Sequence, residues 1–157
     1  MKKINFKALG IAILIPILTG GLSALISMGG MDGYEALTKP PLSPPGWLFP
    51  IVWMVLFVLM GIASYLIYES QAPEEELREA FVLYGLQLFF NFLWSIIFFN
   101  LGMYTLAFVW LAALLGLIVA TAISFFRINK SAGLLLVPYI LWVSFAGYLN
   151  LMIAILN

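Results

Sequence analysis

The sequence predicts an all-α polytopic membrane protein, a single domain of residues 1–157 built as a five-transmembrane-helix bundle. Two observations lead to this fold class. Hydrophobic residues make up 64% of the chain and charged residues only 9%, whereas a soluble protein has roughly 25% charged residues. The few charges also fall in clusters that leave long uncharged runs between them. Because a bilayer offers no water to backbone groups, such runs fold as helices packed in a bundle.

Four uncharged runs define the spans: Ala8 to Gly30, Pro40 to Tyr68, Ala80 to Phe126 and Ser131 to Asn157. A membrane helix needs roughly 20 apolar residues, so the third run is long enough for two helices and each other run holds one. The segment Asn100 to Met103 is the only plausible turn inside the third run, because Asn and Gly end helices readily. The expected helices are 6–28, 46–68, 79–100, 104–126 and 132–155.

The first span has two interpretations, because Lys2, Lys3 and Lys7 precede an apolar stretch. A secretory signal has this arrangement, but the stretch is long and no clear A-x-A cleavage site follows it. We therefore predict a helix that is retained in the protein.

The distribution of cations predicts the orientation in the membrane. Lys and Arg are enriched in cytoplasmic loops. With the N-terminus inside, the outer side receives only Lys39, and the inner side receives the other six cations. These six are Lys2, Lys3, Lys7, Arg78, Arg127 and Lys130. We predict an integral protein of the plasma membrane with a cytoplasmic N-terminus and an outer C-terminus.

The composition also excludes several kinds of chemistry. The chain has no His and no Cys, which removes the usual soft and imidazole metal ligands and the common nucleophile–base pairs. The interiors of the expected spans contain no Asp, Glu, Lys or Arg. This absence disfavours an ion pump, a proton relay or a voltage sensor. Equal numbers of acidic and basic residues leave no basic surface for nucleic acid. We expect no catalytic residues, no cofactor and no metal.

Three of the expected helices each carry a stripe of aromatic and neutral polar residues at helical spacing. The stripes are Trp53, Phe57, Gly61, Ser64 and Tyr68; Tyr84, Gln87, Asn91, Trp94 and Ser95; and Tyr139, Trp142, Ala146 and Asn150. Amides join membrane helices and aromatic residues form interfacial belts, so helix packing is one explanation. However, Trp53, Asn91, Trp94 and Trp142 lie about two turns or more from the span ends. We therefore predict a cavity for a flat, apolar, conjugated molecule, oriented by Gln87 and Asn91.

A stripe of small residues on the fourth expected helix allows close helix contact. It consists of Ala112, Gly116, Ala120 and Ser124, and Gly20 with Ala24 forms a weaker one on the first. Packing inside the bundle and a homodimer contact both remain open for this stripe.

The segment from Lys39 to Trp53 contains five of the eight prolines and two of the five tryptophans. Residues before proline are driven out of the helical region, so we expect residues 29–45 to form a stiff lid over the cavity. Asp32 is expected to cap a short helical turn, and Pro44 with Pro45 to begin the second helix. Trp47 and Trp53 would line the rim and the wall beneath. A rigid linker without a lid role is the alternative.

Three stretches of this chain resemble the tryptophan-rich sensory protein and translocator protein (TspO/MBR) family, also known as the peripheral benzodiazepine receptor family. They are YEALTKPPLSPPGWLFPIVW, QLFFNFLWSIIFF and PYILWVSFAGYLN. The resemblance implies a five-helix bundle, often dimeric, with a ligand cavity beneath the first loop. It also implies binding of porphyrins such as protoporphyrin IX, of synthetic isoquinoline carboxamides or benzodiazepines, and in some members of cholesterol.

Carried onto matching positions, the resemblance supplies cavity and lid residues. The cavity set is Tyr34, Trp53, Gln87, Asn91, Trp94, Tyr139, Trp142, Ala146 and Asn150, to which the stripe on the second helix adds Phe57. The lid set is Lys39, Pro40, Pro44, Pro45 and Trp47.

The chain departs from the family pattern at Leu42 and Gly33, where many relatives have Trp. These departures weaken the case for light-driven porphyrin breakdown by lid indoles. No Lys or Arg follows Tyr148, so we expect no sterol site of the family's C-terminal type.

The function that we expect is a membrane receptor or binding protein for tetrapyrroles, acting as a stress or metabolite sensor or as a carrier. Lys39 would lie near the porphyrin carboxylates, and metal-free porphyrin would be preferred because no His or Cys can ligate haem iron. The expected partners are thus a planar hydrophobic small molecule, the lipid bilayer and a second copy of the chain. A light-dependent porphyrin-degrading enzyme and a passive lipophile transporter remain as alternatives.

Overall fold

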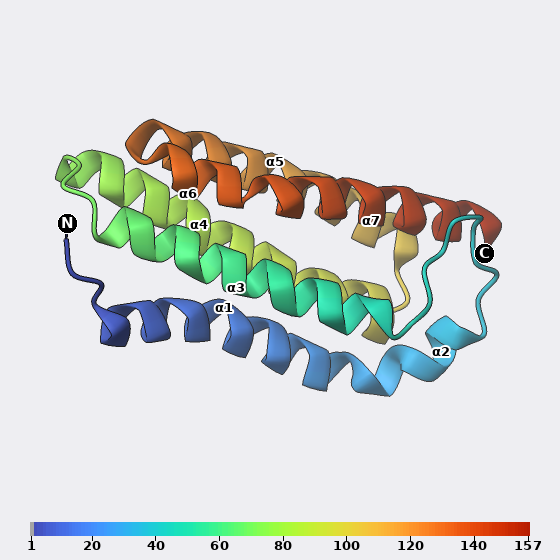
Figure 1. Cartoon of the computed structure of the whole chain (residues 1–157). Coiled ribbons are helices and arrows are strands. Elements are labelled where there is room, and N and C mark those ends of the chain that lie inside the picture. The colour runs from blue at the N-terminus through green and yellow to red at the C-terminus, as the bar shows by residue number, and fades with distance from the viewer. Residues whose placement is uncertain (1) are drawn as a thin grey trace.

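Five long helices lie side by side in the computed structural model, which describes residues 2–157 (Figure 1). They are α1 (Phe6–Ser27), α3 (Leu48–Tyr68), α4 (Glu74–Ser95), α5 (Tyr104–Ile128) and α7 (Val137–Leu156). Shorter elements extend them: η1 (Met28–Gly30), α2 (Met31–Glu35), η2 (Ile96–Asn100) and α6 (Lys130–Leu135). Five continuous helical stretches are long and apolar enough to cross a membrane, which confirms the predicted all-α membrane bundle.

The helices form a closed ring. Helix α1 packs between α3 and α4, α4 packs on α5, and α5 packs on α6 and α7. The fifth span closes the ring on α3 mainly through α6. Along the rest of α7, aromatic side chains bridge the space to α3, as described below.

The two ends of the bundle differ in charge. The N-terminus, the loop between α3 and α4, and the junction of α5 with α6 lie at one end, here called the inner end, and α2, the following loop and the C-terminus lie at the other, the outer end (Figure 1). The inner end therefore receives the six cations that the sequence grouped together, and the outer end receives Lys39. Which of the two ends faces the cytoplasm stays a prediction.

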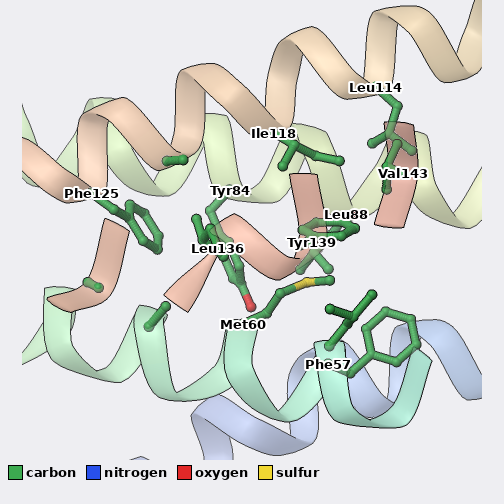
Figure 2. Close-up of a cluster of buried hydrophobic side chains, with 14 of the residues drawn as sticks. Phe57, Met60, Tyr84, Leu88, Leu114, Ile118, Phe125, Leu136, Tyr139 and Val143 are labelled. Atoms are coloured by element: carbon green, nitrogen blue, oxygen red, sulfur yellow. The ribbon is translucent and has the colours of Figure 1, made fainter. Parts of the chain in front are cut away.

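Apolar side chains fill the interior and also cover the surface. Met60, Leu114, Ile118 and Phe125 are almost fully buried between the helices (Figure 2). Many equally apolar residues face outward, and Leu141 is 66% exposed. A bundle that is apolar on both sides is stable only in lipid, since the exposed face would be costly in water.

Two glycines let α1 and α3 approach closely. A Cβ on Gly61 would collide with the backbone of Ala12 and Ile13, and a Cβ on Gly20 would collide with the ring of Phe57. Pro16, buried within α1, lacks the N–H that would bond to the Ala12 carbonyl. Small residues at such contacts allow the backbone-to-backbone packing typical of membrane helices.

The observed bounds correct three expected helix starts. The fifth span begins at Lys130 and not at 132. Helix α4 begins at Glu74 and not at 79, because the acidic residues that the sequence analysis left outside the span favour a helix N-terminus. Helix α3 begins at Leu48 and not at 46, so Pro44 and Pro45 precede the helix and do not start it.

The predicted lid also begins differently. Helical structure continues through η1 and α2 to Glu35, so the non-helical part of the lid is residues 36–47. Asp32 lies in the first turn of α2, where its charge suits the helix dipole, but Gly30 occupies the capping position. The expectation of an Asp32 cap was therefore wrong by two residues.

The fifth span is interrupted where the sequence placed a proline. Asn129 caps α6, because the Ala132 N–H donates to the Asn129 Oδ1 at 3.2 Å. The helix is interrupted at Leu136, between α6 and α7. Pro138 lies in the first turn of α7, where its missing N–H costs nothing.

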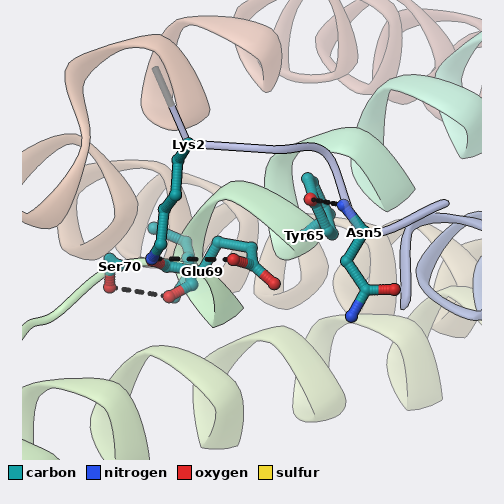
Figure 3. A network of polar contacts seen from close by, with 6 residues as sticks. Lys2, Asn5, Tyr65, Glu69 and Ser70 are labelled. Atoms are coloured by element: carbon teal, nitrogen blue, oxygen red, sulfur yellow. Dashed lines mark hydrogen bonds and ion pairs between the residues drawn. The ribbon is translucent and has the colours of Figure 1, made fainter. Parts of the chain in front are cut away.

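A polar contact holds the N-terminal segment to the inner end of α3 (Figure 3). The Lys2 Nζ donates to the Glu69 carbonyl oxygen at 2.7 Å and lies 3.6 Å from Glu69 Oε2. The Asn5 N–H donates to the Tyr65 hydroxyl at 2.9 Å. These bonds fix the start of α1 against α3.

Candidate functional site

Three polar side chains form a hydrogen-bonded cluster in the middle of the bundle, here called the central triad. The Asn91 Nδ2 donates to the Tyr139 hydroxyl at 2.6 Å, and that hydroxyl donates to Gln87 Oε1 at 2.8 Å. All three residues are buried. Gln87 and Asn91 lie one turn apart on α4, while the break at Leu136 places Tyr139 in the first turn of α7.

Met60 completes the surroundings of the triad. Gln87 Nε2 lies 3.8 Å from the Met60 sulfur, a weak acceptor, and Met60 and Tyr139 belong to the same buried cluster (Figure 2). The sequence analysis missed Met60 and selected its neighbour Gly61 for the stripe. Helical spacing could have indicated Met60, because it lies three residues after Phe57 and therefore on the same side of the helix. Gly61 packs on α1 instead.

Trp53 and Phe57 border the triad from α3. The Trp53 ring meets the Tyr139 ring edge-on, with centroids 6.2 Å apart, and stacks on Phe57 at 5.6 Å. Trp53 is only partly buried. The structure thus brings together five predicted residues, an indole and phenyl wall beside neutral hydrogen-bonding groups.

A second polar link lies nearer the outer end. Trp94 Nε1 donates to Asn150 Oδ1 at 3.0 Å, and Asn150 Nδ2 donates to the Tyr104 carbonyl at 2.9 Å. Trp94 also stacks on Phe98 at 5.2 Å. Ala146, one turn before Asn150 on α7, is buried in the hydrophobic core.

Tyr34 reaches this second link only through other aromatic rings. Its ring lies 6.0 Å from Phe98 and 5.4 Å from Phe99, both in η2. The sequence analysis gave Phe98 and Phe99 no role, although they follow the predicted stripe of α4 directly. The π-helical turn of η2 rotates them toward α2, and a regular 3.6-residue period does not anticipate that rotation.

Trp142 occupies a different position from the other predicted cavity residues. It lines an apolar groove of about 450 Å³ between α3 and α7, together with Ile51, Val55, Leu141 and others. Leu141 and Val55 are among the most exposed residues of their helices, so this groove opens to the outside of the bundle. The Trp142 Nε1 is buried without a hydrogen-bond partner, and its ring lies 5.8 Å from Phe49.

The lid lies across the outer end and is held by side chains. Tyr148 donates to the Pro41 carbonyl at 3.0 Å, and Pro40 is buried. Lys39 Nζ donates to the Glu35 carbonyl at 3.2 Å and lies 4.9 Å from the centroid of the Tyr34 ring. The one cation of the lid is thereby kept beside the aromatic residues of the outer end.

Other predicted lid residues are less enclosed. Pro44 is half-buried and Pro45 is exposed. Trp47 is 67% exposed, and its place at the rim of a cavity stays a prediction. It stands at the N-cap of α3, and its side chain is available to the membrane interface, where indoles are enriched.

Leu42 stands at the tip of a tight turn in the lid. Its φ is 69°, the Ser43 N–H donates to the Pro40 carbonyl at 3.4 Å, and the side chain is 80% exposed. This is the position of a type II turn that favours Gly or Asn. The two prolines before it therefore impose a conformation that leucine adopts only with strain.

The small-residue stripe of α5 runs from the surface into the core. Ala112 and Gly116 are exposed, Ala120 is half-buried and Ser124 is buried. A Cβ on Gly116 would meet nothing within 4 Å. The outer part of the stripe is therefore not used for packing within this bundle.

The assembled site offers neutral hydrogen-bond donors and acceptors beside aromatic faces. Within residues 2–157, no group of three or more His, Cys, Asp or Glu side chains is placed to hold a metal ion. The geometry therefore favours recognition of an apolar molecule with a few polar groups.

Residues 12–156 match the TspO/MBR family. The chain belongs to this family. The match covers all five spans of this TspO/MBR protein, so the central triad, the second polar link and the lid all lie within the family's common region.

Curated relatives of this TspO/MBR protein come from bacteria and from mammals. It is 43% identical to the tryptophan-rich protein TspO of Chlorobaculum tepidum, with 79% of this chain and 78% of the relative covered. It is 36% identical to protein CrtK of Rhodobacter capsulatus (88% and 85% covered). It is 37% identical to the translocator protein of Bos taurus (87% and 82% covered). This chain is therefore an integral membrane protein of the TspO/MBR family.

Proposed function

We propose that this protein is a membrane receptor for porphyrins and similar planar hydrophobic molecules, acting as a sensor or carrier. The observation that carries the proposal is the central triad beside Trp53. A buried amide–phenol–amide cluster in a bundle without internal charge has little structural need, since apolar side chains would fill the same space. Its donors and acceptors suit a ligand with a few polar groups on a flat apolar frame.

The space between α3 and α7 is the proposed position of the ligand. The backbones of these helices are joined here by aromatic pairs, Phe49 with Trp142 and Trp53 with Tyr139. Rings that meet at their edges separate without loss of backbone hydrogen bonds. A macrocycle between them would contact indole faces, and the unpartnered Trp142 N–H would gain an acceptor.

The lid supplies the polar end of this proposed site. Lys39 is the only Lys or Arg in the outer loop and lies over Tyr34. Porphyrin carboxylates directed toward the outer end would approach this cation, while the ring would stay among the helices. We expect a metal-free porphyrin to be preferred, because the chain has no His or Cys to ligate haem iron and the Tyr139 hydroxyl is already bonded to Asn91 and Gln87.

Fluorescence quenching by protoporphyrin IX in detergent tests the proposal. Asn91→Ala and Trp142→Phe are each expected to weaken binding by about tenfold, because a lost hydrogen bond or contact at the ligand is worth about 1.4 kcal/mol at that factor. The matched control is Trp110→Phe. Trp110 stacks on Phe90 and donates to its carbonyl at 2.9 Å, between α4 and α5. Unchanged affinity in both test variants would reject the site.

Light separates binding from turnover in the same assay. Indole can donate an electron to an excited chromophore, and Trp53 and Trp142 both border the proposed site. Illuminated and dark incubations, each with and without oxygen, would reveal porphyrin loss. If the protein is a receptor, the absorbance of the bound porphyrin stays unchanged in the dark, and in the light it falls no faster than that of free porphyrin. If bound porphyrin is lost faster than free porphyrin and this loss requires Trp53, the protein is an enzyme. Flux of porphyrin into proteoliposomes would instead favour a passive transporter.

The orientation and the oligomeric state extend the proposal. The segregation of six cations to the inner end favours a cytoplasmic N-terminus, placing the lid outside. The exposed Ala112 and Gly116 favour α5 as the contact of a homodimer. Labelling of a cysteine introduced at the exposed Leu42 in intact cells tests the first. The mass of the Gly116→Leu variant in detergent tests the second, because a bulky residue would separate the dimer.

A further inference from the structure

The side chain of Asn157 pairs with both backbone groups of Thr38, a residue 119 positions away in the lid. The Thr38 N–H donates to Asn157 Oδ1 at 3.0 Å, and Asn157 Nδ2 donates to the Thr38 carbonyl at 3.0 Å. The same Nδ2 also donates to the Ile153 carbonyl at 3.0 Å. Both hydrogens of the carboxamide and its oxygen are thus engaged.

The pairing of Asn157 with Thr38 constrains both the position and the direction of the lid backbone. A carboxamide that donates to and accepts from the same residue reproduces the pairing of two peptide groups in a sheet. It therefore sets the direction of the chain at Thr38 as well as its position. Thr38 lies outside any helix. When the lid opens, water can replace Asn157 as the hydrogen-bond partner of the Thr38 backbone groups, so the free energy of opening is small.

A second bond from α7 lies on the other side of the buried Pro40. Tyr148 donates to the Pro41 carbonyl at 3.0 Å. The lid is therefore tied to α7 at Thr38 and at Pro41, while between them Lys39 bonds back to α2. Because these ties are exposed hydrogen bonds without ion pairs, they open and close more easily than the packed core.

We propose that Asn157 is a positioning residue that latches the lid and sets how fast a ligand enters and leaves. The part that concerns ligand exchange rests on the proposed function; the latch itself does not. If the lid is latched in the empty and in the occupied protein alike, loss of the latch raises the association and dissociation rates by one factor and leaves the affinity unchanged. A residue with a purely structural role would alter affinity or global stability instead.

Hydrogen exchange of the ligand-free protein tests the latch directly. Asn157→Ala removes every bond to Thr38, and Asn157→Asp, nearly identical in shape, removes the donor to the Thr38 carbonyl. Both are expected to accelerate exchange of residues 36–43 by about tenfold, because two hydrogen bonds to one residue are lost or weakened, and to leave exchange in α5 unchanged. The matched control is Asn100→Ala, which removes an exposed bond of 2.9 Å to the Ile26 carbonyl at the same end. Lid exchange at the wild-type rate in both Asn157 variants would overturn the latch.

Stopped-flow quenching with protoporphyrin IX then tests the effect on the ligand. Association and dissociation are expected to accelerate together in both Asn157 variants, with the dissociation constant within about twofold of wild type. Faster lid exchange with unchanged ligand rates, or a change in the dissociation rate alone, would overturn the gating role. If the wild-type protein does not quench at all, the proposed function fails, and the exchange experiment still decides whether Asn157 latches the lid.

Discussion

Polar side chains lie at membrane depth in two kinds of setting in this protein. At the contacts of α1 with α4 and of α4 with α5 they donate to backbone carbonyls: Ser23 to Phe92 at 2.9 Å and Trp110 to Phe90 at 2.9 Å. Between α4 and α7 they bond to one another, in the chain from Asn91 through Tyr139 to Gln87.

The two settings suit two different roles, which are helix packing and the ligand recognition that we propose. A backbone carbonyl moves only with its helix, so a side chain bonded to it joins two helices permanently. A side chain bonded to another side chain can rotate and exchange that partner for a ligand at little cost to the fold. Both settings use amides, hydroxyls and indoles, so residue type alone does not distinguish them.

The largest effect is expected where backbones touch directly. Gly61→Leu on α3 should destabilise the protein by about 3 kcal/mol or more, because the side chain would meet the backbone of α1 and force the helices apart. SDS-induced unfolding in mixed micelles measures the loss. Gly85→Leu is the matched control, since a Cβ there meets nothing within 4 Å. Equal stability of the two variants would contradict the close α1–α3 contact.

Tyr139→Phe removes the hydroxyl that joins the central triad. We expect this variant to lose both unfolding free energy and affinity for porphyrin. Asn91 Nδ2 and Gln87 Oε1 would lose their shared partner, so we expect a loss of about 2 kcal/mol in unfolding free energy. Porphyrin affinity should fall as well. Tyr68→Phe, at a tyrosine that is 63% exposed, serves as the control. Full porphyrin affinity in Tyr139→Phe would remove the triad from the site.

Ser23→Ala tests the opposite setting. Removal of the bond to the Phe92 carbonyl should cost about 0.6 kcal/mol of stability, the mean for interhelical hydrogen bonds in a membrane protein, and at most about 1.7 kcal/mol. Porphyrin affinity should be unchanged. Ser144→Ala is matched, because the Ser144 hydroxyl donates to Ile140 on its own helix at 2.7 Å. A weaker affinity in Ser23→Ala would show that carbonyl-bonded groups also serve the ligand.

Lys2→Ala should give the smallest effect. The ion pair with Glu69 is largely solvent-exposed on the lysine side, so about 0.5 kcal/mol or less is expected, decreasing with added salt. Unfolding at low and high ionic strength measures it, with the exposed Lys3→Ala as control. A large, salt-independent loss would mean that the contact in Figure 3 holds the inner end more tightly than an exposed pair can.

The sequence predicted the spans and several site residues through local physical rules. Span length follows from hydrophobic runs and bilayer thickness, and all five spans were found. Helical spacing placed Trp53, Gln87, Asn91 and Tyr139 on one polar and aromatic stripe in each of three helices, and the family resemblance grouped these stripes around one site. The start of α4 was misplaced because charged residues were read as loop, although they favour a helix N-terminus.

The sequence could not predict in the same way which residues of different helices face one another. Trp142 shares a stripe with Tyr139, yet it lines an outer groove, because the packing of α7 relative to α3 is a property of the assembled bundle. Met60 and Gly61 are adjacent, and only the position of α1 decides which of them faces the triad.

Membrane insertion, the number of helices, the charge difference between the two ends and the stiffness of the proline-rich lid all follow from the order of residues, since each depends on neighbours along the chain. The pairing of Asn157 with Thr38, of Trp94 with Asn150 and of Ser23 with Phe92 does not. Those pairs join residues from 56 to 119 positions apart, and hydrogen bonds act over about 3 Å. Only the packing of the helices brings such groups within reach of one another.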